Sequence, residues 1–489
     1  MKTQIHDSLP HTLPPGDSHP YRSGAWRPQH VEYDAWDLEV EGRIPDDLHG
    51  VYLRNTENPL HPPIERYHPF DGDGMLHSLA FEAGTARYAN RFVRTAGLLE
   101  ELEAGKSLWA GLAELPAIAT ADHRIGARPR MKDAASTDVV VHGGDALASF
   151  YMCGDLYRLD PVTLEPRGTS DWQGRFPSEG VSAHTKVDEH TGELLFFNYG
   201  TDAPYMHYGE VSADGALTNY VDVELPGSRL PHDMAFTEHY AIVNDCPLFW
   251  SPEAVAAGVY APRFHRDLPT RFGIIPRGGA SEQIRWFEAE PTFVLHWINA
   301  YEDGDEIVLD GFFQQNPSPR PDPEATAEAN LYRYLDLHAL QSIPYRWRFD
   351  LTTGATREGP LGDEILEFGM INGRHGGRPY RYSYDALPAK GWFGFEGIVK
   401  HDVETGEMVT RRLPEGVFAS ETVMAPREGS TAEDDGYLLT FTIDLVNDRS
   451  QCLVLDAADP AGEAVAAITL PERISSGTHA CWAPSTALR

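Results

Sequence analysis

The chain alternates between short apolar runs and polar turn segments. The runs are rich in β-branched and aromatic residues, and they lie at 139–141, 193–197, 240–243, 306–309, 437–443 and 452–455. Runs of this length and composition are typical of strands rather than helices. Many short strands separated by turns indicate an all-β barrel, sandwich or propeller.

The turn segments share a pattern. Residues 188–192, 350–354 and 402–406 all read D-x-x-T-G, and residues 302–305 form a related polar turn. Such hairpin turns resemble those of propeller blades, which are antiparallel units of four strands. No strict repeat period accompanies them, so the pattern alone leaves the barrel and the sandwich open.

The rest of the chain predicts little helix. We expect helices at 96–104 and near 107–113, and we expect residues 1–35, with five prolines, to form an extended arm. The length of 489 residues would suggest three domains at about 150 residues each. However, no segment is long enough to link independent folds, so we expect a single domain over 1–489.

Composition and charge narrow the class of protein. The chain has 40 Lys+Arg against 74 Asp+Glu, a net charge of −34, so nucleic acid and anionic membrane are poor partners. Hydrophobic residues make up 41% of the chain, which excludes global disorder. The N-terminus lacks a secretory pattern, and no C-x-x-C pair occurs among the four cysteines. We therefore expect a cytoplasmic protein with reduced thiols.

Four of the 21 histidines lie in or beside apolar, strand-like runs: His184, His232, His296 and His479. A buried imidazole without a hydrogen-bond partner is costly, so each of them needs a partner. Residues so far apart in the sequence would meet at the axis of a closed, radially built fold. The alternative is four separate core histidines, and the spacing does not decide between the two.

Ordered motifs along nearly the whole chain resemble the carotenoid cleavage oxygenases, non-haem iron enzymes that split a conjugated C=C bond with O₂. The motifs that carry this resemblance lie at 50–59, 70–77, 157–165, 183–188, 231–233, 296–302, 367–372, 380–382 and 477–479. The resemblance implies a seven-bladed β-propeller under a dome of loops and short helices. It also implies Fe(II) on the propeller axis, held by these four histidines, and O₂ as a co-substrate.

The family orients three of its iron ligands with carboxylates, because a hydrogen bond to the far imidazole nitrogen fixes the tautomer. Glu367 and Glu421 match two of them, although Glu421 would also suit an exposed loop. The third position falls on Met152. Either Tyr151 or Asp155 substitutes for it, or one histidine lacks its acid. By analogy with the family, that histidine is His232.

The resemblance implies an Fe(II) dioxygenase that cleaves a carotenoid or apocarotenoid into two carbonyl products. A first alternative is the same chemistry on a phenylpropanoid or stilbene alkene, since residues 54–56 and 70–74 resemble the lignostilbene and isoeugenol branch. That branch places a Lys, which holds the phenol oxygen, where this chain has Tyr151. A second alternative, supported by Met152, is a propeller that binds or isomerises an apolar ligand without cleaving it.

The expected partner is an apolar, conjugated small molecule. Membrane contact would be weak and peripheral at most; Leu108, Trp109 and Leu112 are candidates for it, with packing in a helix core as the competing role. The sequence assigns neither the tunnel residues nor the oligomeric state.

Overall fold

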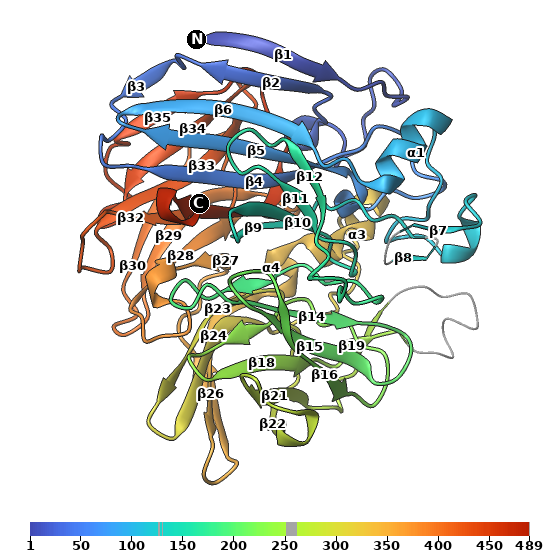
Figure 1. The fold of residues 1–489 in the computed structure, drawn as a ribbon, viewed down its shortest axis with the longest axis vertical. Helices are drawn as coiled ribbons and strands as arrows, with labels where there is room; N and C mark the ends of the chain where they lie inside the picture. Colours follow the sequence, from blue (N-terminus) through green and yellow to red (C-terminus); the bar gives the residue numbers. More distant parts are fainter. Residues whose placement is uncertain (126–127, 130, 251–261, 489) are drawn as a thin grey trace.

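The computed structural model describes residues 1–125, 128–129, 131–250 and 262–488. In this part of the chain, seven large antiparallel sheets stand around a common axis as the blades of a β-propeller (Figure 1). The predicted all-β, seven-bladed architecture is confirmed. Each of the six predicted apolar runs lies in a strand, because alternating apolar positions bury one or both faces of a blade against its neighbours.

The blades follow one another in chain order, and each runs from an innermost strand at the axis to an outer edge. Blade 1 contains β36 (Gly477–Pro484), β4 (Gly50–Asn58), β5 (Asp73–Glu82), β6 (Thr85–Phe92), β2 (Val31–Trp36) and β1 (Lys2–Ser8). Blade 2 contains β9 (Asp138–His142), β10 (Asp145–Ser149), β11 (Tyr157–Leu159) and β12 (Pro166–Thr169). Blade 3 contains β13 (Lys186–Val187), β14 (Leu194–Tyr199), β15 (Tyr205–Val211) and β16 (Leu217–Glu224).

The remaining four blades are built in the same way. Blade 4 contains β17 (Ala235–Phe236), β18 (Tyr240–Asp245), β21 (Thr270–Pro276) and β22 (Arg285–Ala289). Blade 5 contains β23 (Trp297–Asp303), β24 (Glu306–Gln314), β25 (Ser342–Asp350) and β26 (Thr356–Pro360). Blade 6 contains β27 (Glu367–Met370), β28 (Tyr382–Pro388), β29 (Phe395–Asp402) and β30 (Met408–Arg412). Blade 7 contains β32 (Val423–Pro426), β33 (Gly436–Asp444), β34 (Arg449–Asp456), β35 (Ala466–Thr469) and β3 (Val40–Gly42), and β31 (Val417–Phe418) also pairs with β33.

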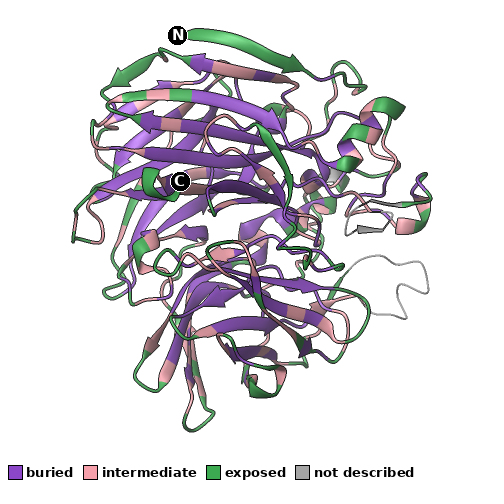
Figure 2. Cartoon of the chain, viewed as in Figure 1, coloured by how far each residue is buried: buried purple, intermediate pink, exposed green. Residues whose placement is uncertain are grey.

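Strands from both ends of the chain close the propeller. In blade 1 the C-terminal strand β36 pairs with β4, and in blade 7 the N-terminal strand β3 pairs with β35. The first and last blades are thus each built from both ends of the chain, which satisfies strand edges that would otherwise be open. At the opposite, outer edge of blade 1, β1 is exposed along its whole length (Figure 2).

The D-x-x-T-G segments form hairpin turns between strands, as predicted. In two of them the Asp carboxylate accepts hydrogen bonds from backbone N–H groups two and three residues later, at Asp350 and at Asp402. Each turn ends on a glycine in the left-handed region, with φ of +77° at Gly354 and +76° at Gly406. Only glycine adopts this conformation at little cost, so the pattern encodes the turn locally.

The dome above the propeller has few helices. Helix α1 (Ala96–Ala104) is confirmed; the Thr95 hydroxyl accepts from the N–H of Leu98 at its start, and Gly105 ends it with φ +66°. Among the described residues the dome also contains the short helices α3 (Ala327–Leu331) and α4 (Leu337–Leu340). It contains two two-stranded pairs as well, β7 (Arg124–Ile125) with β8 (Arg128–Pro129) and β19 (Leu248–Phe249) with β20 (Arg263–Phe264).

The helix expected near 107–113 is wrong. Two carboxylates take backbone N–H groups of this segment: Glu114 accepts from Gly111, and Asp71 accepts from Leu112. These hydrogen bonds replace the i→i−4 bonds of a helix. Trp109 is buried here, so it does not belong to an exposed apolar patch. No helix in the described ranges is long and apolar enough to span a membrane.

A cavity of about 900 Å³ runs along the propeller axis. The innermost strand of every blade lines it: β36, β9, β13, β17, β23, β27 and β32. Several innermost strands contact that of the neighbouring blade, among them β36 with β9, β17 with β23 and β32 with β36, so these blades lie side by side around the axis. The starts of these seven strands meet at one end of the cavity, and the functional site lies there.

Candidate metal centre at the propeller axis

Each blade places one polar residue within three residues of the start of its innermost strand. We call these seven residues the axial ring. All are buried. In order from blade 1 to blade 7 they are His479, Asp138, His184, His232, His296, Glu367 and Glu421.

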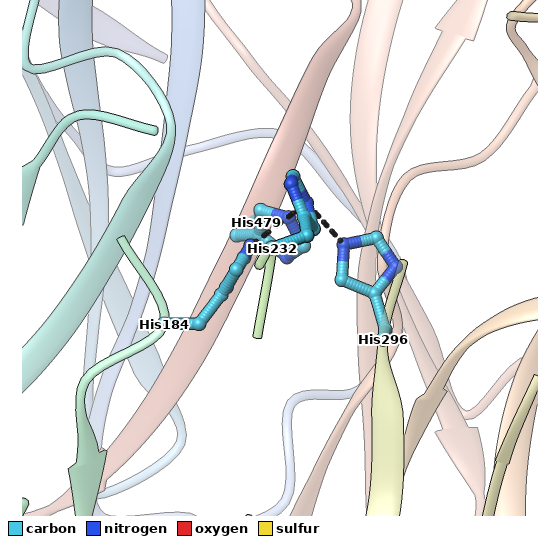
Figure 3. Close-up of side chains that lie close together, drawn as sticks. All are labelled: His184, His232, His296 and His479. Carbon is cyan, nitrogen blue, oxygen red and sulfur yellow. Dashed lines mark hydrogen bonds between the residues drawn. The ribbon is translucent and has the colours of Figure 1, made fainter. Parts of the chain in front are cut away.

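The structure brings the four predicted histidines together. Their nearest ligand atoms all lie within 4.8 Å of one another (Figure 3). The Nε2 atom of His232 is 3.1 Å from Nε2 of His184 and 3.2 Å from Nε2 of His296. The alternative of four separate core histidines is therefore wrong, because they share one site at the axis.

Three of these histidines contact a carboxylate with their other nitrogen. Nδ1 of His296 lies 2.7 Å from Oε2 of Glu367, and Nδ1 of His479 lies 3.2 Å from Oε1 of Glu421. Glu421 is buried and also accepts from a backbone N–H, so the alternative of an exposed loop carboxylate is wrong. Both predicted glutamates thus lie where they contact a ligand histidine.

The third carboxylate is Asp138, which sequence reasoning missed. Its Oδ2 lies 3.0 Å from Nδ1 of His184. A signal for it exists in the sequence: Asp138 directly precedes the apolar run 139–141, just as His296 precedes the strand of its own blade. Only the closed fold shows that these strand starts share one end of the axis.

His232 has no carboxylate. Its Nδ1 is buried, and among the described residues nothing hydrogen-bonds to it. The Met152 sulfur accepts a hydrogen bond from the hydroxyl of Tyr199, while the aromatic ring of Tyr151 packs against the imidazole of His232 at 4.6 Å between centroids. Neither Tyr151 nor Asp155 replaces the missing acid at this nitrogen.

The hydrogen bonds determine where the imidazole protons lie. A carboxylate only accepts, so Nδ1 of His184, His296 and His479 donates, and Nε2 of each neutral imidazole carries a lone pair. These lone pairs point into one small buried space, where they would repel each other without a cation. Two nitrogens bound to one ion at about 2.1 Å and at right angles would lie about 3 Å apart. The observed 3.1 and 3.2 Å agree with this spacing.

Burial keeps most of these imidazoles neutral. It lowers the pKa of His184 and His296 well below the ordinary value and that of His232 to about 3. Burial also lowers the pKa of His479. The negative charges of Glu421 and other nearby acids outweigh burial, so the pKa of His479 is raised. Neutral imidazole is the form that binds a metal.

The backbone at the site is held in unusual conformations. His184 has φ +63° and Phe368 has φ +53°, both in the left-handed region that non-glycine residues rarely occupy. The aromatic ring of Phe368 stacks on the imidazole of His479 with an interplanar angle of 25°. Such strain persists only where surrounding contacts impose it, and it gathers at functional sites.

The chain is thus a propeller whose axis holds a buried cluster of four imidazoles, three of them paired with carboxylates, that could bind a metal ion. A sequence profile of the family described as "Retinal pigment epithelial membrane protein" matches residues 26–484. The chain belongs to this family, which is also that of the carotenoid oxygenases.

Relatives match nearly the whole chain. The carotenoid 9,10(9',10')-cleavage dioxygenase of Crocus sativus is 32% identical, covering 91% of this chain and 85% of the relative. The isoeugenol monooxygenase of Pseudomonas nitroreducens is also 32% identical, covering 95% and 98%. The crystal structure of Pseudomonas brassicacearum lignostilbene dioxygenase superimposes with a TM-score of 0.82 at 28% identity, covering 98% and 99%. The chain is accordingly an oxidoreductase of an oxygenase family, and its four-histidine cluster could hold a metal ion.

Proposed function

We propose that the protein is an Fe(II)-dependent dioxygenase that cleaves one conjugated C=C bond of a carotenoid or apocarotenoid. One O₂ is consumed, and each alkene carbon receives one oxygen atom, so two carbonyl products leave. The observation that carries this proposal is the convergence of His184, His232, His296 and His479 on one buried point at the propeller axis.

The donor set suits Fe(II). Four neutral nitrogens leave the ion its full positive charge, and imidazole is a ligand that iron accepts. When bound, Fe(II) would supply the activation of O₂. Glu367, Glu421 and Asp138 keep three of the imidazoles turned toward the metal, and the burial of the axial ring keeps water away from the reaction.

An aromatic path connects the site with the surface of the dome. Phe368 packs on Phe393 at 5.8 Å between centroids, and Phe393 packs on Phe70 at 5.5 Å. His68 continues the path between Phe70 and the half-exposed Tyr334. We infer that a long apolar substrate approaches along these side chains, since their rings offer contact area and the polar groups of the path, on His68 and Tyr334, lie at its outer end.

The same chemistry on a phenylpropanoid or stilbene alkene is the second candidate. Its support is the likeness to the isoeugenol and lignostilbene enzymes. In this chain Tyr151, rather than a lysine, lies beside His232. A tyrosine hydroxyl can hydrogen-bond a phenol but cannot stabilise a phenolate by charge. We therefore favour the non-phenolic substrate.

The test combines metal analysis with product masses. Iron-loaded protein is incubated under isotopically labelled O₂ with an apocarotenal or with a hydroxystilbene. We expect one labelled oxygen in each carbonyl product of the apocarotenal and one iron per chain. The His296→Ala variant should give no labelled product and bind no stoichiometric iron. His6→Ala, which changes an exposed histidine on β1, is the matched control and should behave as wild type.

Other outcomes point to the alternatives. Cleavage of the hydroxystilbene alone would replace the proposed substrate class with the aryl alkenes. If iron-loaded protein consumed no O₂ with either compound, the non-cleaving, ligand-binding or isomerising propeller would be favoured. We place the protein in the cytoplasm, since all four cysteines are thiols outside disulfides and three of them are buried.

A further inference from the structure

The axial ring has seven positions, and four of them are histidines. At most three positions remain for carboxylates, and all three hold one: Asp138, Glu367 and Glu421. Each of these acids lies in a blade next to the blade of the histidine that it contacts. Asp138 in blade 2 contacts His184 in blade 3, just as Glu367 and Glu421 contact a histidine of a neighbouring blade. Asp138 therefore has the position expected of an orienting acid.

The contacts of Asp138 point away from a purely structural role. Its Oδ1 accepts from the N–H of Val139, the next residue, and its Oδ2 pairs with Nδ1 of His184. Among the described residues, no lysine or arginine forms an ion pair with it. A buried carboxylate that lacks a cationic partner costs folding free energy. This cost is explained if the Asp138 carboxylate orients the His184 imidazole for binding to a metal cation.

Met152 supplies a second, independent observation. The family's usual acid at that position is absent, and Nδ1 of His232 has no partner in the described part of the chain. The chain has an acid at 138 instead, in the same blade but at the start of the innermost strand. The two positions are therefore not equivalent, because Asp138 contacts His184, whereas the resemblance assigns the acid of position 152 to His232.

We propose that Asp138 is a positioning residue of the metal centre, which orients His184 and is the third carboxylate of the site, while His232 keeps no acid of its own. It holds the His184 side chain in the Nδ1–H tautomer and turns Nε2 toward the shared point. His184 also has the left-handed backbone conformation, so backbone and side chain together leave its imidazole one orientation. This inference rests on the proposed metal-dependent function.

The test measures metal binding rather than turnover. Asp138→Asn and Asp138→Ala are compared with wild type by competition of the metal-free protein with a chelator for Co(II), whose visible absorption reports its ligands. We expect Asp138→Ala to weaken Co(II) binding about 10–100-fold, the range for partners that hold a ligand histidine. Asp138→Asn, which keeps an acceptor oxygen but no charge, should fall between, and Asp138→Glu should recover part of the affinity.

Asp214→Asn is the matched control, because it removes the same charge from an exposed turn and should bind Co(II) as wild type does. Thermal unfolding of each metal-free variant separates a local effect from loss of the fold; should Asp138→Ala not fold, Asp138→Asn carries the test. Unchanged Co(II) affinity and spectrum in folded Asp138→Asn and Asp138→Ala would overturn the inference and leave the proposed function standing. A wild-type protein that binds no metal would instead refute the proposed function.

Discussion

Two neighbouring histidines of the axial ring have opposite surroundings. His296 has blade 6 beside it, and the acid of that blade, Glu367, lies 2.7 Å from its Nδ1. His232 lies between blades 3 and 5, which both contribute histidines, and its Nδ1 is buried without a partner among the described residues. Whether a ligand receives an acid therefore depends on circular order. Blades 2 to 5 contribute Asp138, His184, His232 and His296 in that order. Because His232 has a histidine on either side, an acid for it must come from outside the ring.

The two histidines also differ in what holds their tautomer. To bind a metal through Nε2, His232 must carry its proton on Nδ1, where nothing in the described part of the chain accepts it. A buried, unsatisfied donor costs about 1–3 kcal/mol. His296 has no such cost because Glu367 accepts its proton. We infer that His296 contributes more to metal affinity than His232 does.

The largest expected effect comes from removing the two ligands in turn. His296→Ala should lose stoichiometric iron and all activity, with a fall in Co(II) affinity beyond the about 10–100-fold that an orienting carboxylate contributes. His232→Ala should also lose stoichiometric iron, but with the smaller fall. Chelator competition measures both. Equal losses would show that the missing acid leaves His232 as strong a ligand as His296.

The acid beside His296 gives the next largest effect. Glu367→Gln keeps an acceptor for Nδ1 but loses the charge, so Co(II) affinity should fall about 10–100-fold. Glu358→Gln is the matched control; Glu358 also accepts a backbone hydrogen bond and has a pKa raised by burial, but it lies on β26, away from the axis. A loss of affinity in the control as large as in Glu367→Gln would assign the effect to fold stability.

Restoring an acid to His232 should have a smaller effect of the opposite sign. Met152→Glu puts a carboxylate next to Tyr151, whose ring packs against His232, at the position where the resemblance expects the acid of this histidine. We therefore expect Co(II) affinity to rise up to about 10-fold, the lower end of the range for such partners. The metal-free variant should unfold at a slightly lower temperature, because position 152 is only partly exposed and the added carboxylate loses part of its hydration. Met152→Gln, with a neutral side chain of the same length, separates the charge from the shape. No gain in affinity in either variant would mean that the orientation of His232 is already complete.

A change far from the ring should leave metal binding untouched. Gly354→Ala puts a side chain on a turn residue at φ +77°, where a Cβ meets no neighbour, so only backbone strain of about 1 kcal/mol is expected. Gly359→Ala is the control, because it also meets no neighbour and has no positive φ. Denaturant unfolding measures both. Altered Co(II) affinity in Gly354→Ala would show that blade stability and the metal site are coupled.

Much of the fold could be predicted from local patterns. The strands at 139–141 and 437–443 follow from apolar runs, and the turns at 350–354 and 402–406 follow from an Asp that bonds nearby N–H groups and a glycine with positive φ. The helix at 96–104 has its own capping residue, Thr95. The segment 107–113 departs from its pattern because the carboxylates that take its backbone N–H groups, Asp71 and Glu114, lie outside it.

The candidate site divides in the same way. Local sequence was enough to show which histidines lie in or beside apolar, strand-like runs, and the resemblance added that Glu367 and Glu421 accompany them. The contact of Asp138 with His184 and the lack of a partner at Nδ1 of His232 became visible only in the folded chain. The reason is physical: strands and turns arise from interactions between residues close in the chain, whereas the axial ring exists only after β36 pairs with β4 and closes seven blades around one axis.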